Sequence, residues 1–131
     1  MFRILVADLD KLKPINDEFG HPEGDKYIKA AAAVLKSITR DDDIVARIGG
    51  DEFAVILPGM TCQQAEKITE RINDQCRNDQ YYDFNIQISI GCATKSNESD
   101  SLIDVFKMAD SSMYKNKSNS ERTNFKKEET R

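Results

Sequence analysis

The chain has 131 residues, with 19 lysines and arginines against 23 aspartates and glutamates, and therefore a formal net charge of −4. This length predicts one domain with its own core, and the acidic balance argues against a broad nucleic-acid-binding face. The sequence has no apolar run of the roughly 20 residues that a membrane helix needs and no signal-peptide pattern. The 3 cysteines lack metal-binding spacing, which predicts reduced thiols in a cytoplasmic protein.

The N-terminal half predicts a strand, two helices and a hairpin. The first run is apolar on both faces, which is typical of a central buried strand. The second helix has apolar residues at helical spacing, and Gly49-Gly50 separates two β-branched runs, which predicts a hairpin whose glycines take positive φ. The expected ranges are 2–8 for the strand, 11–19 and 23–39 for the helices, and 44–48 and 53–57 for the hairpin strands.

The C-terminal half predicts a helix, a strand and a final helix. Thr61 and Gln64 have the spacing of a capping box and open the first of these helices. One strand is expected over 84–94, and a last helix from Ser101 to about Asn116. Residues 118–131 are polar and charged, which predicts a disordered tail. The order βααββαβα indicates an α+β fold, an α/β sandwich with helices packed on a mostly antiparallel sheet.

Two acidic clusters stand out from the general charge. Asp8 and Asp10 directly follow the first strand, and Asp51 and Glu52 lie on the hairpin turn. If the hairpin pairs beside the first strand, both clusters lie at one end of the sheet. Converging carboxylates favour a hard cation such as Mg²⁺. The alternatives are helix capping by the first pair and a solvated hairpin tip for the second.

Several ordered blocks resemble the GGDEF domains of bacterial diguanylate cyclases. The string Gly49-Gly50-Asp51-Glu52-Phe53 is similar to the family signature, and residues 8–17 resemble its upstream motif. Further similar blocks, spread over residues 3–117, are Gly20-His21, Gly24-Asp25, Ser89-Ile90-Gly91, Ala109-Asp110, Met113-Tyr114 and Lys117. The resemblance implies a GGDEF domain over residues 1–117 with a palm-like, nucleotidyl-cyclase-like fold.

The activity implied by the resemblance is condensation of two GTP molecules into cyclic di-GMP with release of pyrophosphate. By resemblance, Asp8, the Leu9 backbone carbonyl and Asp51 hold Mg²⁺ or Mn²⁺, and Glu52 adds to the metal site. Asp51 is also the implied group that helps to deprotonate the attacking 3′-hydroxyl. Phosphoryl transfer of this kind depends on positioning and charge stabilisation, which suits these residue types.

Other matched positions imply substrate contacts. Lys13 and Lys117 resemble lysines that contact phosphate, and Gly49 and Gly50 leave room for the triphosphate. Asn16 and Asp25 match positions that read guanine. A carboxylate accepts from guanine N1–H and N2–H₂, whereas adenine offers no such donor pair. Without the resemblance, Asp25 is better explained as a favourable charge near a helix N-terminus, and Asn16 as an ordinary polar residue.

Arg40 and Asp43 form an RxxD pair shortly before the signature. By resemblance this offset carries an inhibitory site for the product, and an arginine fork suits phosphate or a guanine edge. A charged loop after a helix is the alternative account. The pair therefore predicts product inhibition by cyclic di-GMP.

Some features depart from the family pattern. The chain starts at the first strand, without the helix that commonly precedes it, and residues 120–124 replace the usual ending after the last helix. Each domain is expected to hold one GTP, so turnover requires a homodimer, which a longer protein with a sensor or regulatory domain would provide. Two alternatives remain: a non-catalytic module that binds GTP or cyclic di-GMP, and another palm-like cyclase or polymerase.

Overall fold

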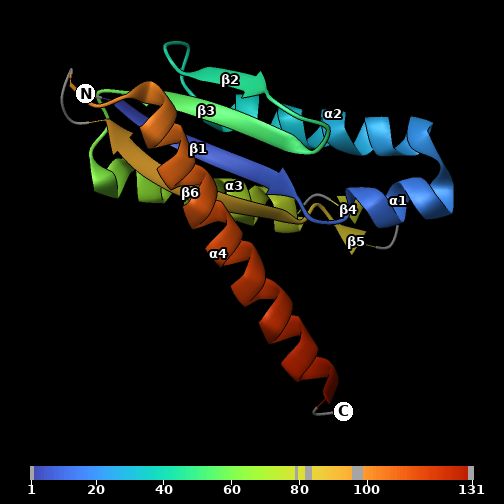
Figure 1. The fold of residues 1–131 in the computed structure, drawn as a ribbon. Helices are drawn as coiled ribbons and strands as arrows, with labels where there is room; N and C mark the ends of the chain where they lie inside the picture. Colours follow the sequence, from blue (N-terminus) through green and yellow to red (C-terminus); the bar gives the residue numbers. More distant parts are fainter. Residues whose placement is uncertain (1, 79, 82–83, 96–98, 130–131) are drawn as a thin grey trace.

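A four-stranded antiparallel sheet carries the fold, which a computed structural model describes for residues 2–78, 80–81, 84–95 and 99–129 (Figure 1). The predicted α+β class is confirmed, with helices packed on both faces of the sheet. The elements are β1 (Phe2–Leu9), α1 (Leu12–Phe19), α2 (His21–Ile38), β2 (Ile44–Arg47), β3 (Glu52–Pro58), α3 (Cys62–Asn78), β4 (Gln80–Tyr81), β5 (Phe84–Asn85), β6 (Ile88–Lys95) and α4 (Leu102–Glu129).

β1 is a central strand, as its unbroken apolar run predicts. The strand order is β2-β3-β1-β6, so β1 has a neighbour on each side. Leu5, Ala7 and Leu9 enter the larger hydrophobic cluster, whereas Ile4 and Val6 enter the smaller one. Because successive side chains of a strand point to opposite faces, one apolar run supplies both cores.

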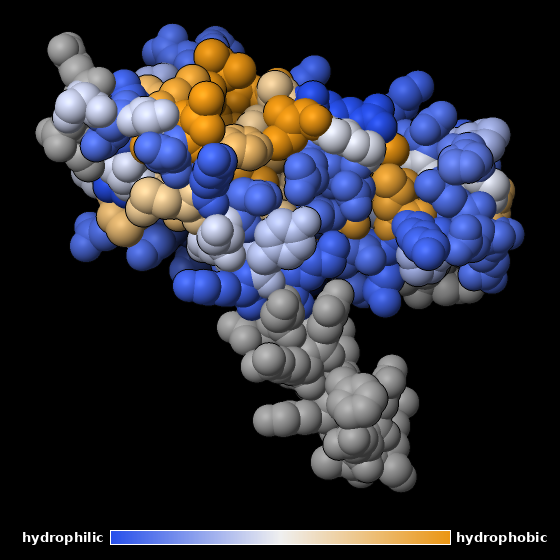
Figure 2. Space-filling model, viewed as in Figure 1, coloured by the Kyte–Doolittle hydropathy of each residue, from blue (hydrophilic) through white to orange (hydrophobic). Residues whose placement is uncertain are grey.

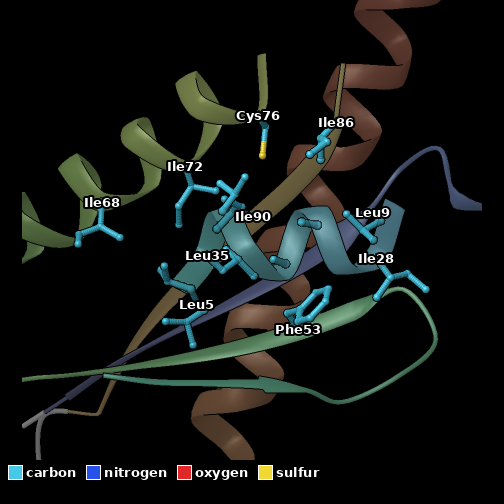
Figure 3. Close-up of a cluster of buried hydrophobic side chains, with 14 of the residues drawn as sticks. Leu5, Leu9, Ile28, Leu35, Phe53, Ile68, Ile72, Cys76, Ile86 and Ile90 are labelled. Atoms are coloured by element: carbon cyan, nitrogen blue, oxygen red, sulfur yellow. The ribbon is translucent and has the colours of Figure 1, made fainter. Parts of the chain in front are cut away.

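The larger core lies between the sheet and helices α2 and α3. Figure 3 shows Leu35 of α2 and Ile68 and Ile72 of α3 directed at the inner face of the sheet, where Leu5 and Phe53 meet them. Burial of a side chain of this size contributes about 1.5–3 kcal/mol. This core holds β1 and β3 rigidly together, and the acidic clusters lie at the end of that pair.

Helix α4 crosses the opposite face of the sheet (Figure 1) and forms the smaller core through Val105, Ala109 and Met113. Apolar side chains remain visible on this face in Figure 2, and Ile44 and Ile48 of the hairpin are exposed. Among the described residues, no helix has the length and apolar composition needed to cross a bilayer.

Helix α4 is longer than predicted. The helix was expected to end near Asn116, and it ends at Glu129 instead; residues 130–131 lie outside the described part. The physical reason is that helix propagation is easy once a packed stretch has formed the first turns, and lysine, arginine and glutamate have good helix propensity. The predicted boundary between a domain and a tail at residue 117 stays a prediction.

The single strand predicted over 84–94 is also wrong in detail. The chain forms a small β4–β5 pair, and the main strand β6 starts only at Ile88. The break follows from specific backbone partners: the Gln87 carbonyl accepts from the Asp10 N–H at 2.9 Å, and the Gln87 N–H donates to the Tyr27 hydroxyl at 2.8 Å. Tyr27 is fully buried, and burial raises its pKa to about 12.

Candidate functional site

The two acidic clusters meet at one end of the sheet. Antiparallel pairing places Asp8 directly opposite Glu52 of β3 on one side and opposite Ser89 of β6 on the other. The Leu9 N–H donates to the Asp51 carbonyl oxygen at 2.9 Å, which ties the hairpin turn to the end of β1. The structure thus brings together acids that are far apart in the sequence.

Asp8 is the most perturbed acid of this group. The residue is buried at 4% exposure, and its Oδ1 accepts no hydrogen bond from the described residues. Burial, followed by the charge of Asp51, raises the pKa of Asp8 from 3.8 to about 7, although Lys117 opposes the shift. A buried carboxylate among like charges favours an added cation.

Glu52 belongs to the same charged cluster. Burial, then the charges of Asp110 and Asp51, raise the pKa of Glu52 above its usual value. Asp110 lies on α4, so that helix brings a further carboxylate toward the hairpin side of the site. Without a bound cation, repulsion between these acids lowers the stability of the folded state.

Lys117 of α4 supplies positive charge to the site. Its Nζ lies 3.5 Å from Asp8 Oδ1 and 3.8 Å from Asp10 Oδ1. Burial lowers the pKa of Lys117, but the carboxylates of Asp8 and Asp10 outweigh that effect and raise the pKa. Asp10 is held in turn by Ser89, whose Oγ lies 3.0 and 2.9 Å from its two carboxylate oxygens and donates to them.

Gly91 explains how α4 comes close enough to deliver Lys117. A Cβ at Gly91 would lie 2.1 Å from the Met113 N and 2.2 Å from the Ala109 carbonyl oxygen, both backbone atoms of the helix. The Asn116 Nδ2 also donates to the Ile90 carbonyl oxygen at 2.6 Å. These contacts set the position of the helix over β6 one turn before the lysine.

The hairpin turn is held by an arginine whose role sequence reasoning missed. Arg47 donates from Nε to the Gly49 carbonyl at 3.0 Å and from Nη2 to the Gly50 carbonyl at 2.9 Å. An arginine placed just before a Gly-Gly pair is the only signal that pointed to this clamp. The two hydrogen bonds fix the turn directly before Asp51, whose carbonyl oxygen accepts from the Leu9 N–H at the end of β1.

The expected positive φ of the turn glycines is not found. Among the described glycines only Gly20 and Gly59 have positive φ. The turn instead closes through the Ile48 N–H, which donates to the Glu52 carbonyl at 2.9 Å. A Cβ at Gly50 would meet nothing within 4 Å, so the space outside this glycine is open. The opening fits the predicted approach of a triphosphate.

The predicted guanine-reading residues lie on the α1–α2 pair that follows β1. A Cβ at Gly24 would lie 1.7 Å from Asn16 Oδ1, so the glycine lets the asparagine pack against α2. That Oδ1 is buried and has no hydrogen-bond partner among the described residues. Lys13 and Asp25 are exposed on α1 and α2. A buried amide oxygen without a hydrogen-bond partner is uncommon in folded proteins.

Arg40 and Asp43 are placed together but bind each other. The arginine Nη2 lies 2.9 Å from Asp43 Oδ1 and donates to the Pro58 carbonyl at 2.8 Å, and the Arg40 N–H donates to Asp43 Oδ2 at 2.7 Å. A ligand at this pair would have to share or replace these contacts. Product binding here stays a prediction.

The donor set suits a hard divalent cation with an incomplete protein shell. No cluster of three or more carboxylate, histidine or cysteine ligands converges in the part of the chain that the structure describes. Mg²⁺ commonly uses one or two carboxylates and completes its octahedron with water and phosphate oxygens. Asp8 Oδ1 is buried and forms an ion pair with Lys117 Nζ at 3.5 Å, which shows that positive charge is favourable at this point.

Comparison with known proteins agrees with this geometry. Residues 1–123 match the family described as "Diguanylate cyclase, GGDEF domain". Diguanylate cyclase A of Treponema denticola is 36% identical over 88% of this chain and 32% of its own length. The chain spans about a third or less (34%, 26% and 32%) of the curated relatives that it matches.

Solved structures give the same result at the level of the fold. The active GGEEF domain of a diguanylate cyclase from Vibrio cholerae has a TM-score of 0.83 and 26% identity, over 90% of this chain and 77% of that one. The GGDEF domain of DgcB from Caulobacter crescentus, in complex with c-di-GMP, has a TM-score of 0.84 and 27% identity, over 90% and 72%. With its signature on the β2–β3 turn and its acids at the end of β1, the chain belongs to the GGDEF domain family of diguanylate cyclases.

Proposed function

We propose that this chain condenses two GTP molecules into cyclic di-GMP and releases pyrophosphate. The observation that carries the proposal is the meeting of the Asp8 and Asp51 segments at the end of β1, with Lys117 reaching the same point from α4. The membership of the chain in a family of diguanylate cyclases supports it. The reaction needs anionic phosphates to be held and neutralised, and this cluster offers that environment.

Asp8, the Leu9 carbonyl and Asp51 would hold Mg²⁺ or Mn²⁺, with Glu52 beside them. The burial of the Asp8 carboxyl group next to the charge of Asp51 supports this assignment. A divalent cation bound there would screen the phosphate charge and make the attacking hydroxyl more acidic. Side chains of the protein would carry out the proton transfer and the remaining stabilisation of charge.

Asp51 would accept the proton of the 3′-hydroxyl as that oxygen attacks the α-phosphate of the second GTP. Lys117 and Lys13 would stabilise the negative charge on the phosphates and on the departing pyrophosphate. The open space outside Gly50 supports a close approach of the triphosphate to the turn backbone. The Arg47 clamp on the turn carbonyls would keep that backbone oriented.

Asn16 and Asp25 would select guanine. The Asp25 carboxylate would accept from N1–H and N2–H₂ of the base, and the buried Asn16 Oδ1 would accept a further donor. A guanine donor would therefore satisfy an amide oxygen that has no partner among the described residues. ATP lacks the same donor pair and would bind less well.

Turnover would require two copies of the domain facing each other, because each copy would hold one of the two GTP molecules. The relatives are far longer than this chain, and in such proteins further segments would control how often two domains meet. In this proposal the homodimer is the active species and the single domain is a half-site.

The test is to incubate the chain with GTP and Mg²⁺ while a fused coiled coil holds it as a dimer. Chromatography should show cyclic di-GMP and pyrophosphate, and Asp51→Ala should reduce the rate by at least about 10³-fold. Asp74→Ala removes an exposed acid of α3 and serves as the matched control with an unchanged rate. GTP binding without product would favour a regulatory module, and a different product would favour another palm-like enzyme.

Product inhibition at Arg40 and Asp43 gives a second prediction. Saturating cyclic di-GMP should depress turnover of the parent chain but not of Arg40→Ala, because the arginine fork is the predicted product contact. The measurement is initial rate against added product. Equal inhibition of both proteins would place any inhibitory site elsewhere.

A further inference from the structure

Lys117 reaches the acid cluster from a different element than the acids themselves. Its Nζ is 3.5 Å from Asp8 Oδ1, the oxygen that accepts no hydrogen bond from the described residues. It is also 3.8 Å from Asp10 Oδ1. One ammonium therefore lies beside two carboxylates at the point where the proposed cation would bind.

We propose that Lys117 is the internal counter-ion of the metal-free site: its ammonium occupies the place of the cation beside Asp8, and a divalent cation must displace it in order to bind. This inference rests on the proposed function only in taking Asp8 as a metal ligand. It makes Lys117 a competitor of the metal as well as a contact for phosphate.

The surroundings of Lys117 allow this exchange with little movement. Its side chain is 25% exposed, and a lysine stem has several rotatable bonds. Asp10 stays close as a second anchor, and Ser89 donates to both of its oxygens and holds it in place. The Nζ can thus leave Asp8 and remain near Asp10.

The displacement of Lys117 by the cation affects how metal and nucleotide bind to the site. A cation arriving alone has to displace the ammonium from Asp8 and offers it no new partner. A cation arriving with a nucleotide brings phosphate oxygens that the displaced ammonium can contact. The site should therefore bind the metal weakly by itself and bind metal and nucleotide together, which limits occupation by free cation.

The experiment measures the affinity of the full chain for Mn²⁺ alone, without nucleotide, from the electron paramagnetic resonance signal of the free ion. It is done at about pH 8.5, above the raised pKa of Asp8. Lys117→Met should bind Mn²⁺ about tenfold more tightly than the parent, because a positive charge beside the ligand is removed. Lys117→Arg keeps that charge and should bind as weakly as the parent.

Lys115→Met is the matched control, because Lys115 is an exposed lysine on the same helix and its loss changes the net charge equally. Its Mn²⁺ affinity should stay within about twofold of the parent. Unchanged or weaker binding by Lys117→Met would overturn the inference, as would equal tightening by the control. The readout needs no GTP, so a chain that makes no cyclic di-GMP still decides this point. If no variant binds Mn²⁺, the metal assignment fails as well.

Discussion

Replacing Asp8 by asparagine should make the metal-free protein more stable above neutral pH and should abolish cyclic di-GMP synthesis. The side chain is buried, and burial and Asp51 raise its pKa from 3.8 to about 7. Asparagine has nearly the same shape but cannot ionise. The variant therefore removes a negative charge that Asp51 repels at the C-terminal end of β1. The same substitution removes a proposed metal ligand.

The sign of the pH dependence follows from this raised pKa. A carboxyl group whose folded pKa lies above its unfolded value stabilises the folded state fully below the unfolded value, here 3.8. That contribution is lost as the pH rises through the folded value, about 7. The parent should thus lose about 1–3 kcal/mol from this group between about pH 4 and pH 8, and Asp8→Asn should not.

Thermal or urea unfolding without metal, at about pH 4 and about pH 8, measures this difference. Asp8→Asn should match the parent at the lower pH and exceed it at the higher one, and added Mg²⁺ should stabilise only the parent. Asp74→Asn, on the exposed surface of α3, is the control that should change little. A variant less stable than the parent at the higher pH would mean that the Asp8–Lys117 ion pair outweighs burial and repulsion.

Gly91→Ala should be the most damaging single-atom addition in the described sheet. The new Cβ would lie 2.1 Å from the Met113 N and 2.2 Å from the Ala109 carbonyl oxygen. Both are backbone atoms, so no side-chain rotation relieves the clash and α4 must shift from β6. Overpacking of this kind costs about 1–3 kcal/mol, a large part of the stability of a domain of this size.

The shift of α4 should also withdraw Lys117 from Asp8 and Asp10. Urea unfolding should show a lower midpoint for Gly91→Ala, and amide hydrogen exchange should show weaker protection in the residues of α4 that face β6. Gly50→Ala is the matched glycine control, because its Cβ meets nothing within 4 Å and its stability should change by less than about 0.5 kcal/mol. Equal midpoints for Gly91→Ala and the parent would contradict the close packing of α4 on β6.

The elements that sequence reasoning placed well are those with strong local periodicity. The predicted bounds agree to within a few residues for β1, the β2–β3 hairpin, α2 and α3. In each of them the apolar residues themselves indicate which positions face the core. The break before β6 was missed, since it depends on Gln87 meeting Tyr27 and Asp10 from distant parts of the chain. The long C-terminal helix was missed because a polar composition does not separate a solvated helix from a tail.

For the site, the sequence pattern itself identified the two acidic clusters and the Gly-Gly turn, and the resemblance to a known family added Lys117. It also predicted that two acidic clusters meet, given that the hairpin pairs beside β1. The tertiary structure decided that Asp8 is buried, that Lys117 lies between Asp8 and Asp10, and that Arg40 and Asp43 bind each other. These facts depend on strand register and on the approach of α4 at Gly91, and such contacts between distant residues leave no periodic signal in the chain.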